Sequence, residues 1–295
     1  MSDRFPHLEP GISDALLLPP QDRLRHVFMN RWIAYTSANA ALAQLDQMLL
    51  LPKVRRSNVL LVAAPGNGKT TLLDEFSRRH PPLVPPAGDP SVPVIRFDMP
   101  PDASETRFWS AVLRAMEVVF RESDNAAKKE ALALDCLRAL RVRVLIIDEF
   151  HNSLHGSSRE TRQFLAVLKN LMNSLAIPIV AAGTKSAITA LNSDPQMTSR
   201  FEAVPLPRWK LDKELRRFLK SLERLLPLAE PSGLASLEIA PLVFELSDGT
   251  IGGICDLVLK AAQRSIEKGI ERIVPVTLRE ARRRTAEASS ELSGI

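Results

Sequence analysis

Cysteine, aromatic residues and long apolar runs are all scarce in this chain. Its cysteines, Cys136 and Cys255, lack metal-ligand spacing, so we expect two buried thiols in a reducing cytosol. No apolar stretch approaches the length of a membrane span, and the first residues lack the basic-then-apolar layout of a signal peptide. We therefore expect a cytoplasmic protein without a membrane partner. A single tyrosine and an aromatic content of 5% argue against a stacking platform for single-stranded nucleic acid.

The rest of the composition is that of a globular protein. Hydrophobic residues make up 45% of the chain and charged residues 25%, and both values are ordinary. A chain of 295 residues can bury a large core, and we expect one α/β domain and one smaller domain. The net charge of +5 and the isoelectric point near 9.4 permit nucleic-acid binding without requiring it.

A phosphate-binding loop is the strongest local pattern. The apolar, β-branched run 58–62 predicts a buried strand, and it leads into glycines that let backbone N–H groups converge on an anion. Helical spacing follows, and a helix N-terminus adds its positive dipole end. Lys69 is expected to reach the β- and γ-phosphates of ATP, and the Thr70 hydroxyl to ligate Mg²⁺. The predicted nucleotide contacts are Pro65, Gly66, Asn67, Gly68, Lys69, Thr70 and Thr71.

An acidic pair follows a second apolar run. Residues 142–147 predict another buried strand, which ends at Asp148 and Glu149. Acids at the carboxyl end of a strand lie in the crevice where open α/β sheets bind ligands. Asp148 is expected to hold Mg²⁺ through water, and Glu149 to polarise the attacking water. An acidic turn after a core strand is common in isolation, so it is the pairing with the upstream loop that predicts a P-loop ATPase.

The order of the patterns predicts three segments. Residues 1–21 are proline-rich and predict an extended arm, 22–208 predict the nucleotide-binding α/β domain, and 209–295 predict a helical lid with a basic tail. The predicted strands are 58–62, 94–97, 142–147, 177–182 and 203–206, and the predicted helices before the lid are 22–51, 104–122, 125–140 and 158–175. This layout resembles that of AAA+ ATPases, which implies a parallel-sheet sandwich followed by a smaller C-terminal helical lid.

Resemblance to AAA+ proteins implies further site residues. Thr184, after the fourth strand, is a candidate sensor 1 that touches the γ-phosphate or the attacking water; a hydroxyl that caps the next helix is an equal alternative. Arg200, just before the fifth strand, is a candidate arginine finger that enters a neighbouring subunit's site; a surface salt bridge is the alternative. The stretch 248–254, where a lid often supplies a sensor 2 arginine, contains none, so we expect slow hydrolysis.

Several stretches together resemble the TniB family, AAA+ regulators of transposition related to TnsC. They span residues 22–275 in order and comprise 31–35, 38–50, 52–58, 66–70, 147–152, 182–184, 199–201 and 250–253. The lead-in to the loop and the Asp-Glu-Phe-His-Asn run discriminate most, because many ATPases share the phosphate-binding loop. Ala63 departs from the Gly that more often opens the loop, and we still expect a working site.

The resemblance implies a bacterial protein whose ATP-bound subunits form a ring or helical filament on duplex DNA. The assembly would mark a target site and recruit a transposase and a small target-selection adaptor, and ATP hydrolysis would dissolve it. The resemblance also places Trp32, Ile33 and Tyr35 on the adenine side of the nucleotide. A hydrophobic staple for the lid is the alternative role for these three residues.

Basic residues on segments that can line a central channel are candidate DNA contacts, since phosphate contacts need only cationic donors. These candidates are Arg107, Lys128, Lys129, Arg159 and Arg162, and the tail residues Arg279, Arg282, Arg283 and Arg284 are further candidates for DNA or the transposase. A solvated charged face is the alternative. Binding is expected to be sequence-independent and to fall steeply with salt.

Two other functions stay open at this stage. The chain fits an ATPase of another class, either helicase-loader-like or secretion-associated, whose partner is a protein. It also fits a signalling switch that binds ATP and hydrolyses it slowly. Assembly on plain duplex DNA with a non-hydrolysable ATP analogue discriminates the transposition regulator from both, because a helicase loader needs a helicase and a switch is indifferent to DNA.

Overall fold

The computed structural model describes residues 5–50, 58–83, 85–86, 88–102, 104–155 and 157–283. These residues divide into two compact units. Residues 37–207 form the first, which we call the sheet unit; residues 5–36 and 208–283 form the second, which we call the helical unit. None of the helices in these ranges is long and apolar enough to cross a bilayer.

A five-stranded parallel sheet organises the sheet unit. Its strands are β1 (Asn58–Ala63), β2 (Val94–Asp98), β3 (Val144–Asp148), β4 (Ile179–Gly183) and β5 (Phe201–Leu206), in the order β2-β3-β4-β1-β5. β4 therefore separates the strand that leads to the glycine loop from the strand that ends at Asp148. Because every strand runs in the same direction, all five carboxyl ends meet at one edge. The predicted α/β class with a parallel sheet is confirmed.

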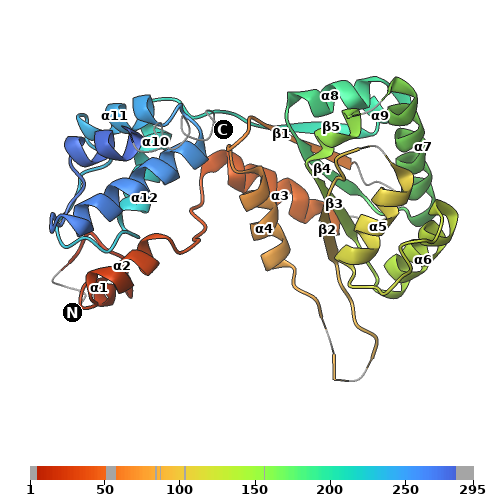
Figure 1. Cartoon of the computed structure of the whole chain (residues 1–295), viewed down its shortest axis with the longest axis horizontal. Coiled ribbons are helices and arrows are strands. Elements are labelled where there is room, and N and C mark those ends of the chain that lie inside the picture. The colour runs from red at the N-terminus through yellow and green to blue at the C-terminus, as the bar shows by residue number, and fades with distance from the viewer. Residues whose placement is uncertain are drawn as a thin grey trace. The chain divides into compact units, whose positions relative to one another are not determined.

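Helices cover both faces of this sheet (Figure 1). One face carries α3 (Thr36–Leu50) and α4 (Lys69–Arg79), and the other carries α5 (Glu105–Ala115), α6 (Ala126–Ala139) and α7 (Ser158–Leu175). Shorter segments connect the strands near their ends: η3 (Phe150–Leu154), α8 (Lys185–Asn192) and α9 (Pro195–Thr198). Strong amphipathicity and a capping box at Ser157 and Glu160 explain why α7 has the predicted bounds.

The few aromatic residues concentrate in the core of the sheet unit. The Phe108 ring lies 5.5 Å from that of Phe97, 5.1 Å from that of Trp109 and 5.2 Å from that of Phe164, each in an edge-on arrangement. All four are buried, and each such pair adds about 0.5–1.5 kcal/mol beyond the burial of its area. The cluster packs α5 and α7 against β2, the strand that borders β3 and its acidic end.

The structure corrects the predicted domain boundaries. The described part of the predicted arm, residues 5–21, is not extended: it includes α1 (Ile12–Ala15) and the start of α2 (Pro20–Val27), and its Leu8 is buried. The backbone N–H of Glu9 donates to the carbonyl of Arg224 at 3.0 Å. The α/β domain therefore begins near residue 37 rather than 22, because residues 5–36 pack with the C-terminal helices.

Two of the predicted helices are shorter than expected. The stretch 22–51 is split into α2 and α3. Between them the Arg31 guanidinium donates to the carbonyls of His26 at 3.0 Å and Leu225 at 3.1 Å, which fixes the connecting segment. The stretch 104–122 ends at Ala115, where Glu117 takes a left-handed conformation with φ of 58°. Local periodicity does not reveal either break.

The helical unit holds α10 (Lys213–Glu223), α11 (Ile239–Leu246), α12 (Ile251–Glu267) and a helix over 275–283. Arg23 fastens α2 to this unit. It donates to the Glu271 carboxylate at 3.0 and 2.6 Å and to the carbonyl of Pro227 at 2.6 Å. The Arg23 side chain is only 9% exposed, so removing its counter-charge leaves a buried cation unpaired.

Replacement of Glu271 by Gln is expected to destabilise the protein by about 3 kcal/mol. The hydrogen bond from Arg23 holds the pKa of Glu271 below the usual value of 4.5. The resulting stabilisation is therefore present at neutral pH and is lost as the pH falls through the folded-state pKa. Urea unfolding across this pH range measures both effects. The control Arg25→Ala removes an exposed ion pair with Asp22 and should destabilise the protein by less than about 1 kcal/mol. An equally small loss of stability in Glu271→Gln would contradict a stabilising role of the Arg23–Glu271 pair.

Candidate nucleotide-binding and hydrolysis site

The glycine loop after β1 is preformed for an anion. Gly66 and Gly68 have φ values of 66° and 80°, a left-handed conformation that side chains disfavour. α4 begins at Lys69 directly after Gly68, and no side chain caps its N-terminus, so its first N–H groups point toward the loop. The buried Asn67 amide donates to the carbonyls of Leu206 at 2.8 Å and Pro207 at 3.0 Å and anchors the loop to the end of β5.

Lys69 lies folded across this loop. Its Nζ is 3.4 Å from the carbonyl oxygen of Ala64, and the residue is 6% exposed. Pro65, Gly66, Thr70 and Thr71 are exposed. The predicted loop residues thus lie together in one turn that fits a polyphosphate, and their phosphate contacts stay a prediction.

Thr70 and Asp148 come together from α4 and β3. The Thr70 hydroxyl donates to Oδ2 of Asp148 at 2.9 Å, and Asp148 is 1% exposed. A hydroxyl and a carboxylate are the hard oxygen donors that Mg²⁺ prefers, so these residues fit the predicted metal. The second carboxylate oxygen, Oδ1, accepts the backbone N–H of Glu149 at 2.9 Å.

Glu149 occupies a strained position beside this pair. Its φ of 51° is left-handed, which costs a non-glycine residue energy and is frequent at functional sites. Its side chain is 42% exposed, with Oε2 3.2 Å from Nδ1 of His151. Its exposure and its place at the end of β3 fit the predicted general base, and that role stays a prediction.

Thr184 lies at the same edge, at the end of β4 between β1 and β3. Its hydroxyl makes a 2.7 Å hydrogen bond with Oγ of Ser186 and does not cap the backbone of α8. Gly183 is required there because an added Cβ would lie 2.9 Å from Cβ of Ala187 and 3.3 Å from the backbone nitrogen of His151. The position of Thr184 fits the predicted sensor, although its role stays a prediction.

Arg200 lies at the opposite edge of the sheet. It immediately precedes β5, whose first residue pairs with Asn58 at the start of β1. The Asn58 side chain donates to the carbonyl of Arg200 at 3.0 Å and accepts the N–H of Ile179 at 2.8 Å, which fixes the Arg200 backbone. The Arg200 guanidinium donates to Oδ1 of Asn173 at 3.0 Å, a neutral partner. The length of β1 puts roughly 15–20 Å between Arg200 and the loop of its own chain.

The adenine-side candidates lie in the helical unit. The Tyr35 ring is 5.1 Å from that of Trp209 and 6.2 Å from that of Phe218. Burial raises the pKa of Tyr35 to about 12, and Ile33 packs against the same core. These contacts account for a packing role, and the adenine role of Trp32, Ile33 and Tyr35 stays a prediction.

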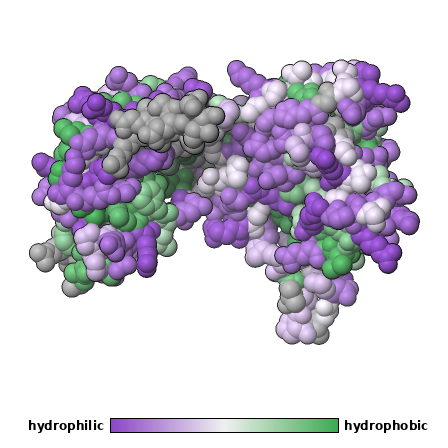
Figure 2. Space-filling view, in the orientation of Figure 1, coloured by the Kyte–Doolittle hydropathy of each residue, from purple (hydrophilic) through white to green (hydrophobic). Residues whose placement is uncertain are grey.

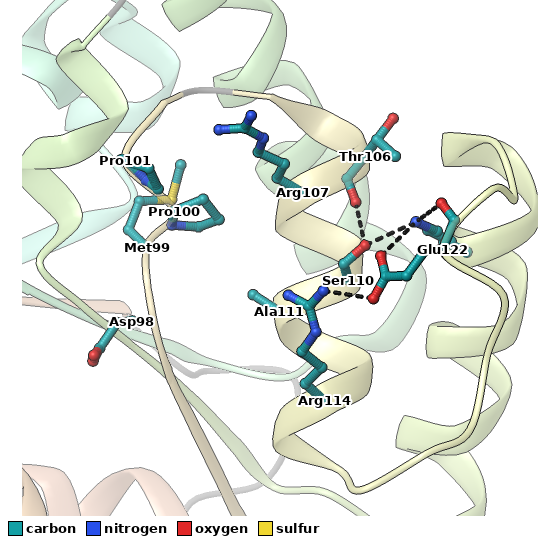
Figure 3. Close-up of a pocket in the computed structure, with 11 residues that line it drawn as sticks. Asp98, Met99, Pro100, Pro101, Thr106, Arg107, Ser110, Ala111, Arg114 and Glu122 are labelled. Atoms are coloured by element: carbon teal, nitrogen blue, oxygen red, sulfur yellow. Dashed lines mark hydrogen bonds and ion pairs between the residues drawn. The ribbon is translucent and has the colours of Figure 1, made fainter.

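One DNA-contact candidate is corrected by the structure. Lys129 is only 2% exposed and donates to Oγ of Ser110 at 2.9 Å and to the carbonyl of Glu122 at 3.0 Å. Lys129 lines a cavity of about 570 Å³ beside the end of β2, and Figure 3 labels its partners Ser110 and Glu122 in the wall of that cavity. Its ammonium therefore holds α5, α6 and the loop between them together and does not face solvent.

The other four candidates, Arg107, Lys128, Arg159 and Arg162, are exposed. They lie on the sheet unit, whose visible surface is largely hydrophilic in Figure 2. Arg107 pairs with Asp102 at 2.8 Å at the cavity rim. A surface pair of this kind is weak and exchanges readily for a phosphate. Of the tail candidates, Arg284 lies outside the described residues.

Sequence patterns missed Arg96 and Arg208, and they gave Arg282 only a candidate role in the basic tail. Arg96 on β2 contacts Asp148 and Asp74; a lone charge inside an apolar strand pattern could have indicated it. Near the start of α12, Nη1 of Arg208 lies 3.3 Å from the carbonyl of Asp248, and Nη2 of Arg282 lies 3.2 Å from its carboxylate. These two residues are remote in sequence from the stretch 248–254, so no local pattern identifies them.

Comparisons with known proteins agree with this geometry. The family model described as "Bacterial TniB protein" matches residues 23–211, more than half of the chain. Comparison with curated protein sequences gives no match. Similar solved structures confirm the P-loop AAA+ fold. The Aeropyrum pernix ORC1 protein in complex with DNA has a TM-score of 0.62 and 16% identity, over 89% of this chain and 69% of that chain. Cdc6p from Pyrobaculum aerophilum has a TM-score of 0.61 and 18% identity, over 86% of this chain and 69% of that chain.

A bacterial structure is also similar. The Holliday junction branch migration motor RuvB of Thermotoga maritima has a TM-score of 0.51 and 17% identity, over 88% of this chain and 72% of that chain. At these identities the likeness shows the fold alone. The AAA+ architecture predicted from the sequence is confirmed by it, and the resemblance to TniB proteins is confirmed by the family match.

Replacement of Lys69 by Ala is expected to weaken ATP binding at least about 100-fold, because a charge-assisted contact to phosphate of about 3 kcal/mol is lost. Equilibrium titration with a fluorescent ATP analogue measures this. Lys220→Ala, at an exposed position on α10, is the control and should bind normally. Equal affinity of the two variants contradicts the assignment of the loop.

Proposed function

Because this chain belongs to the TniB family, we propose that it is an ATP-dependent, DNA-bound regulator of transposition. ATP-bound subunits assemble as a ring or helical filament on duplex DNA and mark the target site. They recruit a transposase and a target-selection adaptor, and hydrolysis dissolves the assembly. The geometry at the carboxyl edge of the sheet supports the nucleotide part of this proposal, and the position of Arg200 supports the assembly.

Each residue at the carboxyl edge has a role in hydrolysis. The loop amides and Lys69 hold the phosphates, and Thr70 and Asp148 would hold Mg²⁺, which would neutralise charge on the phosphates. Glu149 orients and polarises the water that attacks the γ-phosphorus and accepts its proton, while the bond to the β–γ bridging oxygen breaks and ADP leaves. Thr184 hydrogen-bonds to the γ-phosphate or to that water, since β4 places it between the phosphate loop and Glu149.

Completion of the site requires a second subunit. Arg200 lies about 15–20 Å from its own phosphate loop, a distance that no side chain spans. A guanidinium held at the far edge of the sheet is instead available to the nucleotide of a neighbour, where it stabilises charge on the transferring phosphoryl group. This single observation carries the proposal of an ATP-dependent assembly, because contacts to the γ-phosphate across the interface disappear after hydrolysis.

Duplex DNA is the proposed scaffold of the assembly. A protein of similar fold, the Aeropyrum pernix ORC1 protein, has been seen in complex with DNA. In this chain Arg107, Lys128, Arg159 and Arg162 provide exposed cations on one unit, and the net charge is positive. Such contacts to phosphates hold any sequence equally well.

Arg200→Ala is expected to bind ATP normally and to lose hydrolysis at least about 100-fold, because a trans-acting arginine supplies about 10³–10⁵ in rate. Mixing it with Lys69→Ala tests the direction of the contact. A Lys69→Ala subunit lacks a working loop and keeps Arg200, so next to an Arg200→Ala subunit it completes one site. ATP hydrolysis by the mixture must therefore exceed that of either variant alone. If mixing restores no hydrolysis at any protein concentration, Arg200 is not an arginine finger.

The DNA contacts predict a specific salt dependence. Arg107→Ala and Lys128→Ala are expected to weaken binding to any duplex and each to reduce the slope of log K against log salt by about 0.9. Fluorescence anisotropy with duplexes of unrelated sequence measures both quantities. Lys220→Ala is the control and should leave the slope unchanged. Unchanged slopes for both test variants exclude these residues from the DNA interface.

A further inference from the structure

Arg96 lies in the middle of β2 and faces away from the aromatic core. Its neighbours Ile95 and Phe97 are buried, whereas Arg96 alternates to the other side of the strand. That side of the sheet is the one covered by α4 (Figure 1), the helix that follows the phosphate loop. A half-buried cation in the middle of a strand requires polar partners, and Arg96 has two carboxylates.

The Arg96 guanidinium bridges two carboxylates. Nη1 contacts Asp74 on α4, and Nη2 lies 3.1 Å from Oδ2 of Asp148. The exposures of the partners differ sharply: the Asp148 side chain is 2% exposed and that of Asp74 is 56% exposed. The planar fork of arginine suits such a bridge, since its nitrogens reach two acceptors at once.

The contacted oxygen is the one that also accepts the Thr70 hydroxyl, at 2.9 Å. Thr70 and Asp148 are the proposed Mg²⁺ ligands, so Arg96 places a positive charge beside the carboxylate oxygen that would bind the metal. Two cations at one carboxylate oxygen repel each other. Without either cation, the buried Asp148 carboxylate would keep its hydrogen bonds from Thr70 and Glu149 but lack a counter-charge, which is unfavourable.

We propose that Arg96 is a placeholder cation for the metal. It neutralises Asp148 while Mg²⁺ is absent, and it moves onto Asp74 when Mg²⁺ and nucleotide bind. Arg96 is thus a positioning residue that acts through Asp148 and sets how much Mg²⁺ the site requires. This inference rests on the proposed Mg²⁺–nucleotide site and is independent of DNA and of assembly.

The alternative is a supporting role, in which Arg96 only orients Asp148 for the metal. The two roles predict opposite changes in metal affinity when Arg96 is replaced. Removal of a competing cation tightens metal binding, whereas removal of a supporting partner weakens it. Replacement of Asp74 also distinguishes the two roles. Without Asp74, the Arg96 guanidinium has Asp148 as its remaining carboxylate partner, so it competes more strongly with the metal for Asp148.

The test titrates the full-length protein with Mg²⁺ in the presence of a fluorescent, non-hydrolysable ATP analogue, and repeats it with Mn²⁺ detected by electron paramagnetic resonance. Arg96→Gln is expected to lower the metal concentration at half-saturation about tenfold, the effect of about one pK unit of electrostatic interaction. Asp74→Asn is expected to raise it several-fold. Arg96→Lys, which keeps the charge, should stay close to the parent protein.

Arg78→Gln is the matched control, since Arg78 bridges to Glu75 on α4 with 72% of its side chain exposed. It should leave the metal requirement unchanged. A higher or unchanged metal requirement for Arg96→Gln overturns the placeholder, and so does a shift of Asp74→Asn in the same direction as Arg96→Gln. Asp74 is exposed, so its variant keeps the test valid if Arg96→Gln does not fold. Failure of the parent protein to bind the analogue would instead overturn the proposed nucleotide site itself.

Discussion

The Asp148 carboxylate is the group on which the nucleotide site depends. It is buried at the end of β3, and both of its oxygens are engaged: Oδ1 by the backbone of Glu149, and Oδ2 by Thr70 and Arg96. Through these contacts it joins β3 to α4 and to β2. A charge this deeply buried requires cationic or hydrogen-bond donors around it. The donors around it therefore stabilise this carboxylate in the absence of a ligand.

The strand order decides which functional groups lie together at each edge of the sheet unit. Because all the strands are parallel, the phosphate loop, Thr184 and the acidic pair lie at the carboxyl edge, and the place of β4 between β1 and β3 makes them neighbours. Asn58 and Arg200 lie at the amino edge. On the account proposed above, each chain thus carries a nucleotide pocket at one edge and its complement at the other. Contacts of this head-to-tail kind close into rings or continue as helical filaments.

Residues with short-range patterns could be predicted from the sequence, and residues defined by tertiary packing could not. The loop 65–71 and the Asp148–Glu149 pair lie at strand ends that apolar runs reveal, and α7 is amphipathic enough to give its bounds. Lys129 was misassigned because a pattern of basic residues does not show that one of them is buried against Ser110 and Glu122. The packing of the N-terminal arm and of the segment between α2 and α3 depends on contacts with Leu228 and Leu225, about two hundred residues away.

Electron microscopy of the protein with plain duplex DNA tests the central claim most directly. The full chain is mixed with duplexes of unrelated sequence and either a non-hydrolysable ATP analogue or ADP. The account predicts ordered rings or filaments on DNA with the analogue, and their absence with ADP or with the Arg200→Ala variant. A protein that stays monomeric on DNA when saturated with the analogue, or that assembles equally well with ADP, contradicts an assembly controlled by the triphosphate.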